Sequence, residues 1–160
     1  MNSRFCRWLI VSALLITASS AWAQCKPAFG AQNIATLKQQ AAHGKAAAQC
    51  SLGAMYEDGK GVPQNYAQAV AWWRKAAEQG EAEAQWRLGY MYFNGRGVPQ
   101  DFAEAYFWND LAAAGKLDAP FAKDVATFRD AIASHLTPED LSREQERARK
   151  WFEAHQAKPQ

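Results

Sequence analysis

The sequence predicts an all-α protein: a short right-handed α-solenoid of helical hairpins, closed at its C-terminus by a capping helix pair. Three observations predict this fold. When residues 44–79 are laid over residues 80–115 without a gap, 18 of the 36 residue pairs are identical. Within each copy, apolar residues recur at three- and four-residue steps, the spacing of one face of an α-helix. Glycine and proline separate these stretches, as expected between two antiparallel helices.

The first 23 residues have the features of a signal peptide. Arg4 and Arg7 precede an apolar run, residues 8–18, which is much shorter than the roughly 20 residues of a membrane-spanning helix. A small-x-small cleavage site ends at Ala23. We therefore expect a periplasmic or secreted protein, residues 24–160, that has no membrane span.

The expected mature chain has no charge bias toward a nucleic-acid partner. The whole sequence holds 18 Lys and Arg, 16 Asp and Glu, and a net charge of +2. Removing Arg4 and Arg7 leaves 16 bases against 16 acids, so the net charge becomes zero. A neutral surface with both signs interspersed does not attract phosphates. With such a surface, a monomer is the expected state.

Two cysteines, Cys25 and Cys50, remain after the expected cleavage. In an oxidising compartment they favour one disulfide, which would stabilise the fold by about 3–4 kcal/mol in the chain-entropy model. The alternative is that Cys50 is a small buried core residue and Cys25 an unpaired thiol near the N-terminus.

The N-terminal part of the mature chain is not a complete repeat. Residues 24–32 are expected to be loose. Residues 33–45 are predicted to form the degenerate half of an earlier repeat, because Ala41 and Gly44 align with the last alanine and the closing glycine of the first full repeat.

The two full repeats, 46–80 and 81–115, are each predicted to form a helix, a tight loop and a second helix. The first helix of the first repeat carries an apolar stripe: Ala48, Leu52, Met55 and Tyr56. The segment 58–63 then ends this helix, because its glycines permit positive φ and Pro63 cannot continue a helix.

The second helix of each repeat is predicted from its first residue. Asn65 and Asp101 are expected N-caps, and a Gln or Glu three residues later is expected to complete a capping box. Trp72 and Trp108 recur at one position of this helix, so we expect both in the core.

After Gly115 the repeat pattern fades, and residues 116–156 are predicted to form two capping helices. An apolar stripe defines the first of them: Phe121, Val125, Phe128, Ile132 and Leu136. Thr137 is the expected N-cap of the second, with Pro138 at the first helical position. A solenoid needs a terminal unit with a polar outer face, which this pair would supply. Residues 157–160 are expected to be a loose tail.

The repeated motif begins at Leu52 and again at Leu88, and runs Leu-Gly-x-Met-Tyr-x-x-Gly-x-Gly-Val-Pro-x-[Asn/Asp]-[Tyr/Phe]-Ala-x-Ala-x-x-Trp-x-x-x-Ala-Ala. It resembles the SEL-like repeat family of the tetratricopeptide superfamily, here an exported bacterial member. The glycine spacing, the proline, the tryptophan and the alanine pair match in both copies. Asn109 departs from the pattern, since the first repeat has Trp73 at that position.

The sequence favours a non-catalytic role without metal or cofactor. Its three histidines, His43, His135 and His155, lack metal-ligand spacing and are expected at the surface or at helix ends. A phosphate-binding glycine loop and a Gly-x-Ser-x-Gly motif are both missing from the sequence. An acylating serine enzyme would need Ser-x-x-Lys, and no serine in residues 24–160 has a lysine at that offset.

A binding surface is predicted from the first-helix positions that differ between the repeats. They share one helical face: Cys50/Trp86, Ala54/Tyr90 and Glu57/Phe93. First helices usually line the concave side of such stacks, and Trp, Tyr and Arg are enriched at interaction hot spots. The candidate partner-binding residues are therefore Trp86, Arg87, Tyr90, Phe93, Ala54 and Glu57. The alternative is that the aromatic stripe packs internally, against the preceding repeat or the cap.

The expected function is a non-catalytic protein–protein interaction module. It would be an exported adaptor or scaffold that holds a peptide or protein segment of the cell envelope on its concave face. One alternative is a small secreted inhibitor or immunity-type protein of one enzyme. Another is a cell-wall glycan binder, for which stacked aromatic residues such as Trp86 would form the platform. A third is a purely structural role.

Overall fold

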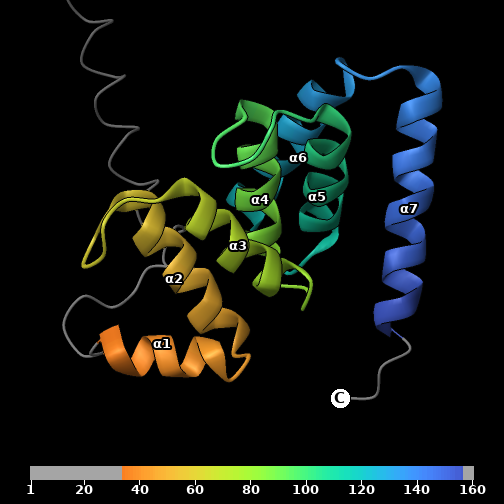
Figure 1. The fold of residues 1–160 in the computed structure, drawn as a ribbon. Coiled ribbons are helices and arrows are strands. Elements are labelled where there is room, and N and C mark those ends of the chain that lie inside the picture. The colour runs from red at the N-terminus through yellow and green to blue at the C-terminus, as the bar shows by residue number, and fades with distance from the viewer. Residues whose placement is uncertain (1–33, 157–160) are drawn as a thin grey trace, which may run out of the picture.

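The computed structural model describes residues 34–156, in which all regular secondary structure is helical. Seven helices follow in order: α1 (Ile34–Ala42), α2 (Ala46–Asp58), α3 (Tyr66–Ala77), α4 (Ala82–Asn94), α5 (Phe102–Ala114), α6 (Ala119–Ala133) and α7 (Pro138–Gln156). Figure 1 shows two adjacent hairpins, α2 with α3 and α4 with α5, with α1 against α2 and α7 beside α5. The predicted all-α repeat solenoid is confirmed.

Four of the predictions fall outside the described residues. They concern the signal peptide (1–23), the loose segment (24–32), the tail (157–160) and Cys25. Cys50, the other cysteine of the predicted disulfide, is fully buried in the main core. The disulfide and the export of the chain therefore stay predictions.

The predicted helix caps form, but neither expected capping box does, because Asn65 N and Asp101 N donate to Tyr56 O and Tyr92 O instead. Asn65 Oδ1 accepts a hydrogen bond from Gln68 N at 3.0 Å, and Asp101 Oδ1 accepts one from Glu104 N at 3.0 Å. The Glu104 side chain does not bond back to the cap. Its carboxylate instead accepts hydrogen bonds from Trp108 Nε1 at 3.0 Å and from α7 at 2.7 Å. A contact between helices thus replaces the local one.

The loop between the two helices is built in the same way in both repeats. Gly59 and Gly95 end α2 and α4 with φ of 69° and 64°, values that glycine adopts without strain. Gln64 and Gln100 then donate side-chain hydrogen bonds to carbonyls in the last turns of α2 and α4, at 2.8 and 2.7 Å. The recurring glutamine therefore fixes the end of the loop to the helix that the glycine terminates.

The centre of the core is Trp73, which is completely buried and joins side chains of α2, α3, α4, α5 and α7 in one cluster. Its indole lies against the backbone of Gly53: a Cβ at this glycine would be 2.5 Å from Trp73 Cδ1. Asn109 occupies the equivalent position of the second repeat, opposite Gly89, and is also completely buried. The first and second helices thus cross closely at a glycine in both repeats.

Of the two recurring tryptophans, only Trp108 is a core residue. It is 4% exposed and belongs to the main cluster. The expectation for Trp72 is wrong in part, because this side chain is only half-buried, with Lys75 Nζ 4.4 Å from its ring centroid. Before α2 the described chain supplies only the nine-residue helix α1, which covers one side of Trp72.

A second pair of glutamines joins consecutive hairpins. Gln49 Nε2 donates a hydrogen bond to Ala41 O at 3.1 Å, and Gln85 Nε2 donates one to Ala77 O at 3.1 Å. Both side chains are buried. The junction between α1 and α2 therefore repeats the junction between α3 and α4.

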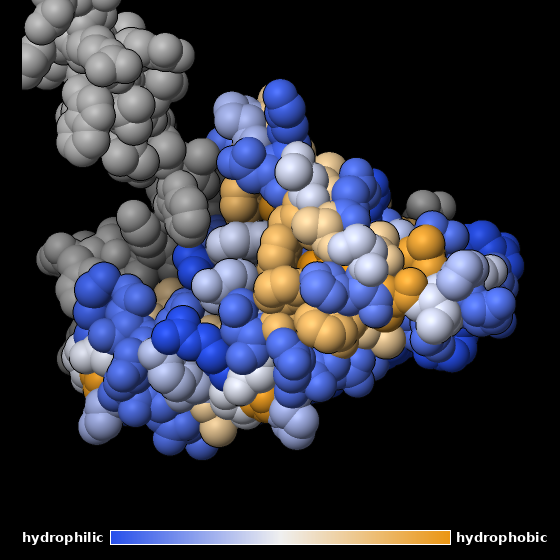
Figure 2. All heavy atoms as spheres, turned by 90° about the horizontal axis from the view of Figure 1, so that it is seen from above, coloured by the Kyte–Doolittle hydropathy of each residue, from blue (hydrophilic) through white to orange (hydrophobic). Residues whose placement is uncertain are grey.

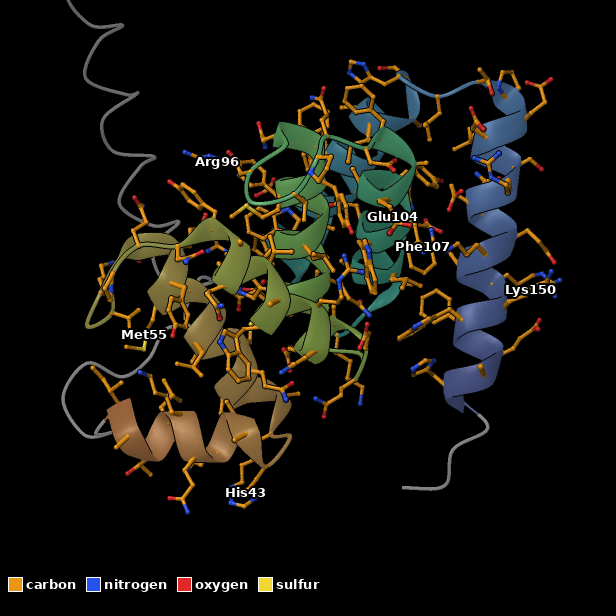
Figure 3. The ribbon with its side chains drawn as sticks, viewed as in Figure 1. His43, Met55, Arg96, Glu104, Phe107 and Lys150 are labelled. Carbon is orange, nitrogen blue, oxygen red and sulfur yellow. The ribbon has the colours of Figure 1, made fainter. Side chains whose placement is uncertain are left out.

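Helix α7 is held to α5 mainly by charged and aromatic side chains. Arg147 Nη1 lies 2.7 Å from Glu104 Oε1, and its Cζ lies 3.8 Å from the ring centroid of Phe107. Figure 3 shows Glu104 and Phe107 pointing from α5 toward α7, while Lys150 points away from α5. The outward face of α7 is therefore polar, as a terminal helix requires.

Candidate functional site

The aromatic stripe of α4 is neither fully exposed for a partner nor fully packed inside the protein, the two alternatives that the sequence left open. Trp86, Tyr90 and Phe93 are all half-buried. They lie against aromatic rings of α6: the ring centroids are 5.2 Å apart for Trp86 and Phe121, and 6.1 Å apart for Tyr90 and Phe128. The stripe thus packs against the helix that follows the second repeat, but it is not enclosed by it.

Phe93 packs against rings of both α5 and the end of α6. Its ring makes edge-to-face contacts with Phe102 at 5.6 Å, with Phe128 at 5.2 Å and with His135 at 5.8 Å. His135 is an exposed side chain that stacks on Phe102 at 4.6 Å, so its role here is to cover a ring. Phe93 is accordingly a packing residue rather than a free contact residue.

A surface cavity of about 290 Å³ lies beside the other two aromatic residues of the stripe. Its lining consists of Trp86, Tyr90, Phe121, Asp124 and Phe128. The last three residues share one face of α6, since they follow one another at steps of three and four. Figure 2 shows hydrophobic side chains gathered in the middle of the face seen from above, within a hydrophilic surround.

Sequence reasoning missed the part that α6 plays in this site. Phe121 and Phe128 belong to the predicted apolar stripe, but only as core residues of a capping helix. In the structure Val125 and Ile132 are completely buried, whereas the two phenylalanines stay half-exposed. The signal available in the sequence was Asp124, an acid on the same helical face as two aromatic residues.

Three other candidate residues lie together on the neighbouring part of the same face. Glu57 Oε2 accepts a hydrogen bond from Arg87 Nη1 at 3.2 Å, which joins α2 to α4. The two side chains are only 15% and 19% exposed. Ala54 is half-buried against the main core. In the structure Glu57 and Arg87 therefore form an ion pair between the repeats.

The Glu57 carboxyl has a pKa above its ordinary value of 4.5, because burial disfavours the charged form and the guanidinium of Arg87 offsets only part of this effect. We expect it to titrate above pH 4.5, and we expect Arg87→Met to raise its pKa further. Arg96→Met should raise the pKa less, because Arg96 contributes a smaller attraction. The pH dependence of the Glu57 carboxyl ¹³C resonance measures all three values.

The sign of the stability effect follows from this shift. The folded chain binds the Glu57 proton more tightly than the unfolded chain does. The contribution of this residue therefore favours folding below pH 4.5 and is lost as the pH rises through the folded-state pKa. An Arg87→Met variant with an unchanged Glu57 midpoint would contradict the ion pair.

Within residues 34–156 no group of three or more His, Cys, Asp and Glu side chains is placed to hold a metal ion. In the same part of the chain, no helix is both long and apolar enough to cross a bilayer. The lining of the cavity consists of aromatic rings and one carboxylate.

Comparison with protein families gives three matches to the Sel1 repeat, at residues 46–81, 82–116 and 126–154, which together cover more than half of the chain. This chain belongs to the Sel1 repeat family. The first two Sel1 repeats are the two hairpins α2–α3 and α4–α5. The third match falls on α6 and α7, the helices that we expected to act as a cap. Sel1 repeats generally mediate protein–protein interactions, and the fold is typically non-catalytic.

Two solved structures of Sel1 repeat proteins resemble this one. One is a protective antigen present in uropathogenic Escherichia coli strains, described as having an SLR fold, with a TM-score of 0.67 and 32% identity over 78% of this chain. The other is a Sel1 repeat protein from Oxalobacter formigenes, with a TM-score of 0.52 and 38% identity over 57% of this chain. The chain spans only 28% and 37% of their lengths. A comparison with curated proteins found no match.

Proposed function

We propose that this Sel1 repeat protein is an exported, non-catalytic adaptor. It binds a peptide or protein segment in the cavity between α4 and α6, on the face formed by the first helices of the repeats. The observation that supports this proposal is the cavity itself: half-buried aromatic rings from two repeats surround an open volume of about 290 Å³. Aromatic side chains that remain partly exposed on a stable scaffold are typical of interaction hot spots.

The proposal includes a location and a state of assembly. The signal-peptide features of residues 1–23 support export to the periplasm or beyond. The zero net charge of residues 24–160 and the mixed signs of their charges support a monomer that meets its partner through a local apolar site. The partner is expected to be a protein of the cell envelope.

The test is a pull-down from a cell-envelope extract, with the wild-type protein, Tyr90→Ala and Tyr66→Ala as baits. Tyr66 is a half-buried tyrosine outside the cavity lining, so its variant is the matched control. We expect Tyr90→Ala to weaken the captured partner about 30-fold, or about 2 kcal/mol, as for a hot-spot residue. Titration calorimetry with the purified partner measures this loss.

Different outcomes separate the alternatives. An identical partner list and equal affinity for wild type and Tyr90→Ala would contradict the cavity as the binding site. If the protein captures a single partner very tightly, and this partner is an enzyme, the inhibitor alternative is favoured. Calorimetric binding of peptidoglycan fragments that depends on Trp86 would favour the glycan binder.

A further inference from the structure

The lining of the cavity indicates the charge of what it binds. Four of its five residues are aromatic, and the fifth, Asp124, is an acid. The face of an aromatic ring carries partial negative charge, so several rings around one space attract a cation. A carboxylate at the same place adds a full negative charge. Both features of the lining therefore favour a positively charged occupant.

Asp124 has no partner of its own among the described residues: it makes no hydrogen bond and no salt bridge there. Helix α6 carries two basic residues, Lys123 and Arg129. Lys123 is exposed and makes no salt bridge among the described residues. Arg129 is paired with other acids. It lies 3.3 Å from Asp110 and 2.7 Å from Asp130. The negative charge at the cavity is therefore not neutralised within residues 34–156.

The Trp86 ring already has a cation beside it in the folded chain. The Cζ atom of Arg87 lies 4.8 Å from the centroid of this ring, within the range of a cation–π interaction. The charge of this guanidinium is balanced by Glu57, 3.2 Å away, and not by Asp124. Arg87 thus shows that the ring accepts a guanidinium, and it leaves the acid of the cavity unpaired.

The size of the cavity is sufficient for one long side chain. A volume of about 290 Å³ lies at the lower end of the pockets that hold small drug-like ligands. Lysine and arginine have long apolar stems that pack along rings, and a charged end that stays near solvent and a counter-ion. Asp124 is exposed, so it is placed to meet such a charged end.

We infer that the cavity binds the cationic side chain, lysine or arginine, of the partner segment. The stem lies among Trp86, Tyr90, Phe121 and Phe128, and the cation pairs with Asp124. This inference rests on the proposed function, because it names the anchor residue of the segment that the adaptor holds. It also makes the partner site selective against acidic and neutral segments.

The test uses four peptides, acetyl-Gly-Ser-Xaa-Ser-Gly-amide, in which Xaa is lysine, arginine, norleucine or glutamate. Norleucine has a linear apolar side chain without the charge. Binding is followed by the indole N–H resonance of Trp86, assigned with Trp86→Phe, in the whole protein at low salt. We expect the lysine and arginine peptides to shift this resonance to saturation, and the norleucine peptide to bind about tenfold more weakly.

The matched variants are Asp124→Asn and Asp118→Asn. Each variant removes one acid, but Asp118 is the residue just before α6 and does not line the cavity. Asp124→Asn should weaken the lysine peptide about tenfold, while Asp118→Asn should leave its affinity unchanged. An equal loss in both variants would mean that only the general charge of the helix matters, and would overturn the inference.

Two further outcomes separate this inference from the proposed function. If the norleucine peptide binds as well as the lysine peptide, cation recognition is wrong and an apolar binding site remains. If no peptide shifts the Trp86 resonance, cation recognition is wrong, and the pull-down with Tyr90→Ala decides on the adaptor function independently.

Discussion

Replacing Trp73 with alanine will lower the free energy of unfolding by about 4 kcal/mol, the usual loss for a fully buried tryptophan. Trp73 is completely buried, and its cluster includes side chains from five helices. The deletion removes the largest fully buried side chain of the described residues and leaves a cavity in the core. Small domains have about 5–15 kcal/mol of stability in total, so the variant will be close to unfolding.

Urea denaturation followed by circular dichroism measures this loss, with Trp72→Ala as the matched control. Trp72 is the adjacent tryptophan on α3 but is half-exposed, so its removal should cost much less. Trp73→Phe should also cost less than alanine, because it keeps a ring and removes an indole N–H that has no hydrogen-bond partner within the described residues. A Trp72→Ala variant that is as unstable as Trp73→Ala would contradict the assignment of Trp73 as the core centre.

The variant Gly53→Ala should be destabilised by about 3 kcal/mol, although alanine is the better helix former by about 1 kcal/mol. The added methyl group would meet the Trp73 indole, 2.5 Å from Cδ1, and this ring is completely buried in the core. Close packing therefore outweighs helix propensity at this position. The sign of the effect is opposite to the one expected for a glycine on an exposed helix face.

Gly80→Ala separates this clash from the ordinary penalty for a glycine with positive φ. Gly80 has φ of 89°, but a Cβ there would meet only Trp151, at 3.7 Å. We expect this variant to lose about 1 kcal/mol, from backbone strain alone. Thermal denaturation of both variants compares them, and equal losses would argue against a steric cause at Gly53.

The stability losses of Trp73→Ala and Gly53→Ala should not be additive. In Trp73→Ala the indole is gone, so the methyl group of Gly53→Ala enters the space that the indole left. The double variant should then be more stable than the sum of the single losses predicts, by about 2 kcal/mol. Additive losses would mean that the two residues do not share this contact.

The repeat, its loops and its caps could be predicted from the sequence because each is a local or a periodic property. The 36-residue spacing, the N-caps Asn65 and Asp101, and the glycines that end α2 and α4 all appear in the structure as expected. The caps and the loop glycines depend on residues within a few positions of one another, and the repeat depends on a regular spacing of 36 residues. The sequence of one repeat also locates the other repeat.

What could not be predicted is the choice of distant partners. Glu104 has the spacing of a capping box, but Arg147 offers it a charge from another helix. Trp72 and Trp73 are neighbours in the sequence, but Trp73 lies in the main core, whereas Trp72 packs only against the smaller cluster that includes Leu37 and Leu52. Glu57 and Arg87 were expected to face a partner, yet each lies within reach of the other, 30 residues away. Periodicity assigns a residue to a face, but it does not specify what covers that face.

The buried glutamines at the junctions, Gln49 and Gln85, make the assembly modular. Each uses one side-chain amide to bind the carbonyl of an alanine in the helix before it, with the same length of 3.1 Å. Each unit thus carries the donor of one joint near its start and the acceptor of the next joint at its end, as Gln49 and Ala77 do in the first repeat. Duplication of one 36-residue unit would insert an extra copy whose two joints already fit, whereas loss of a few residues would break both.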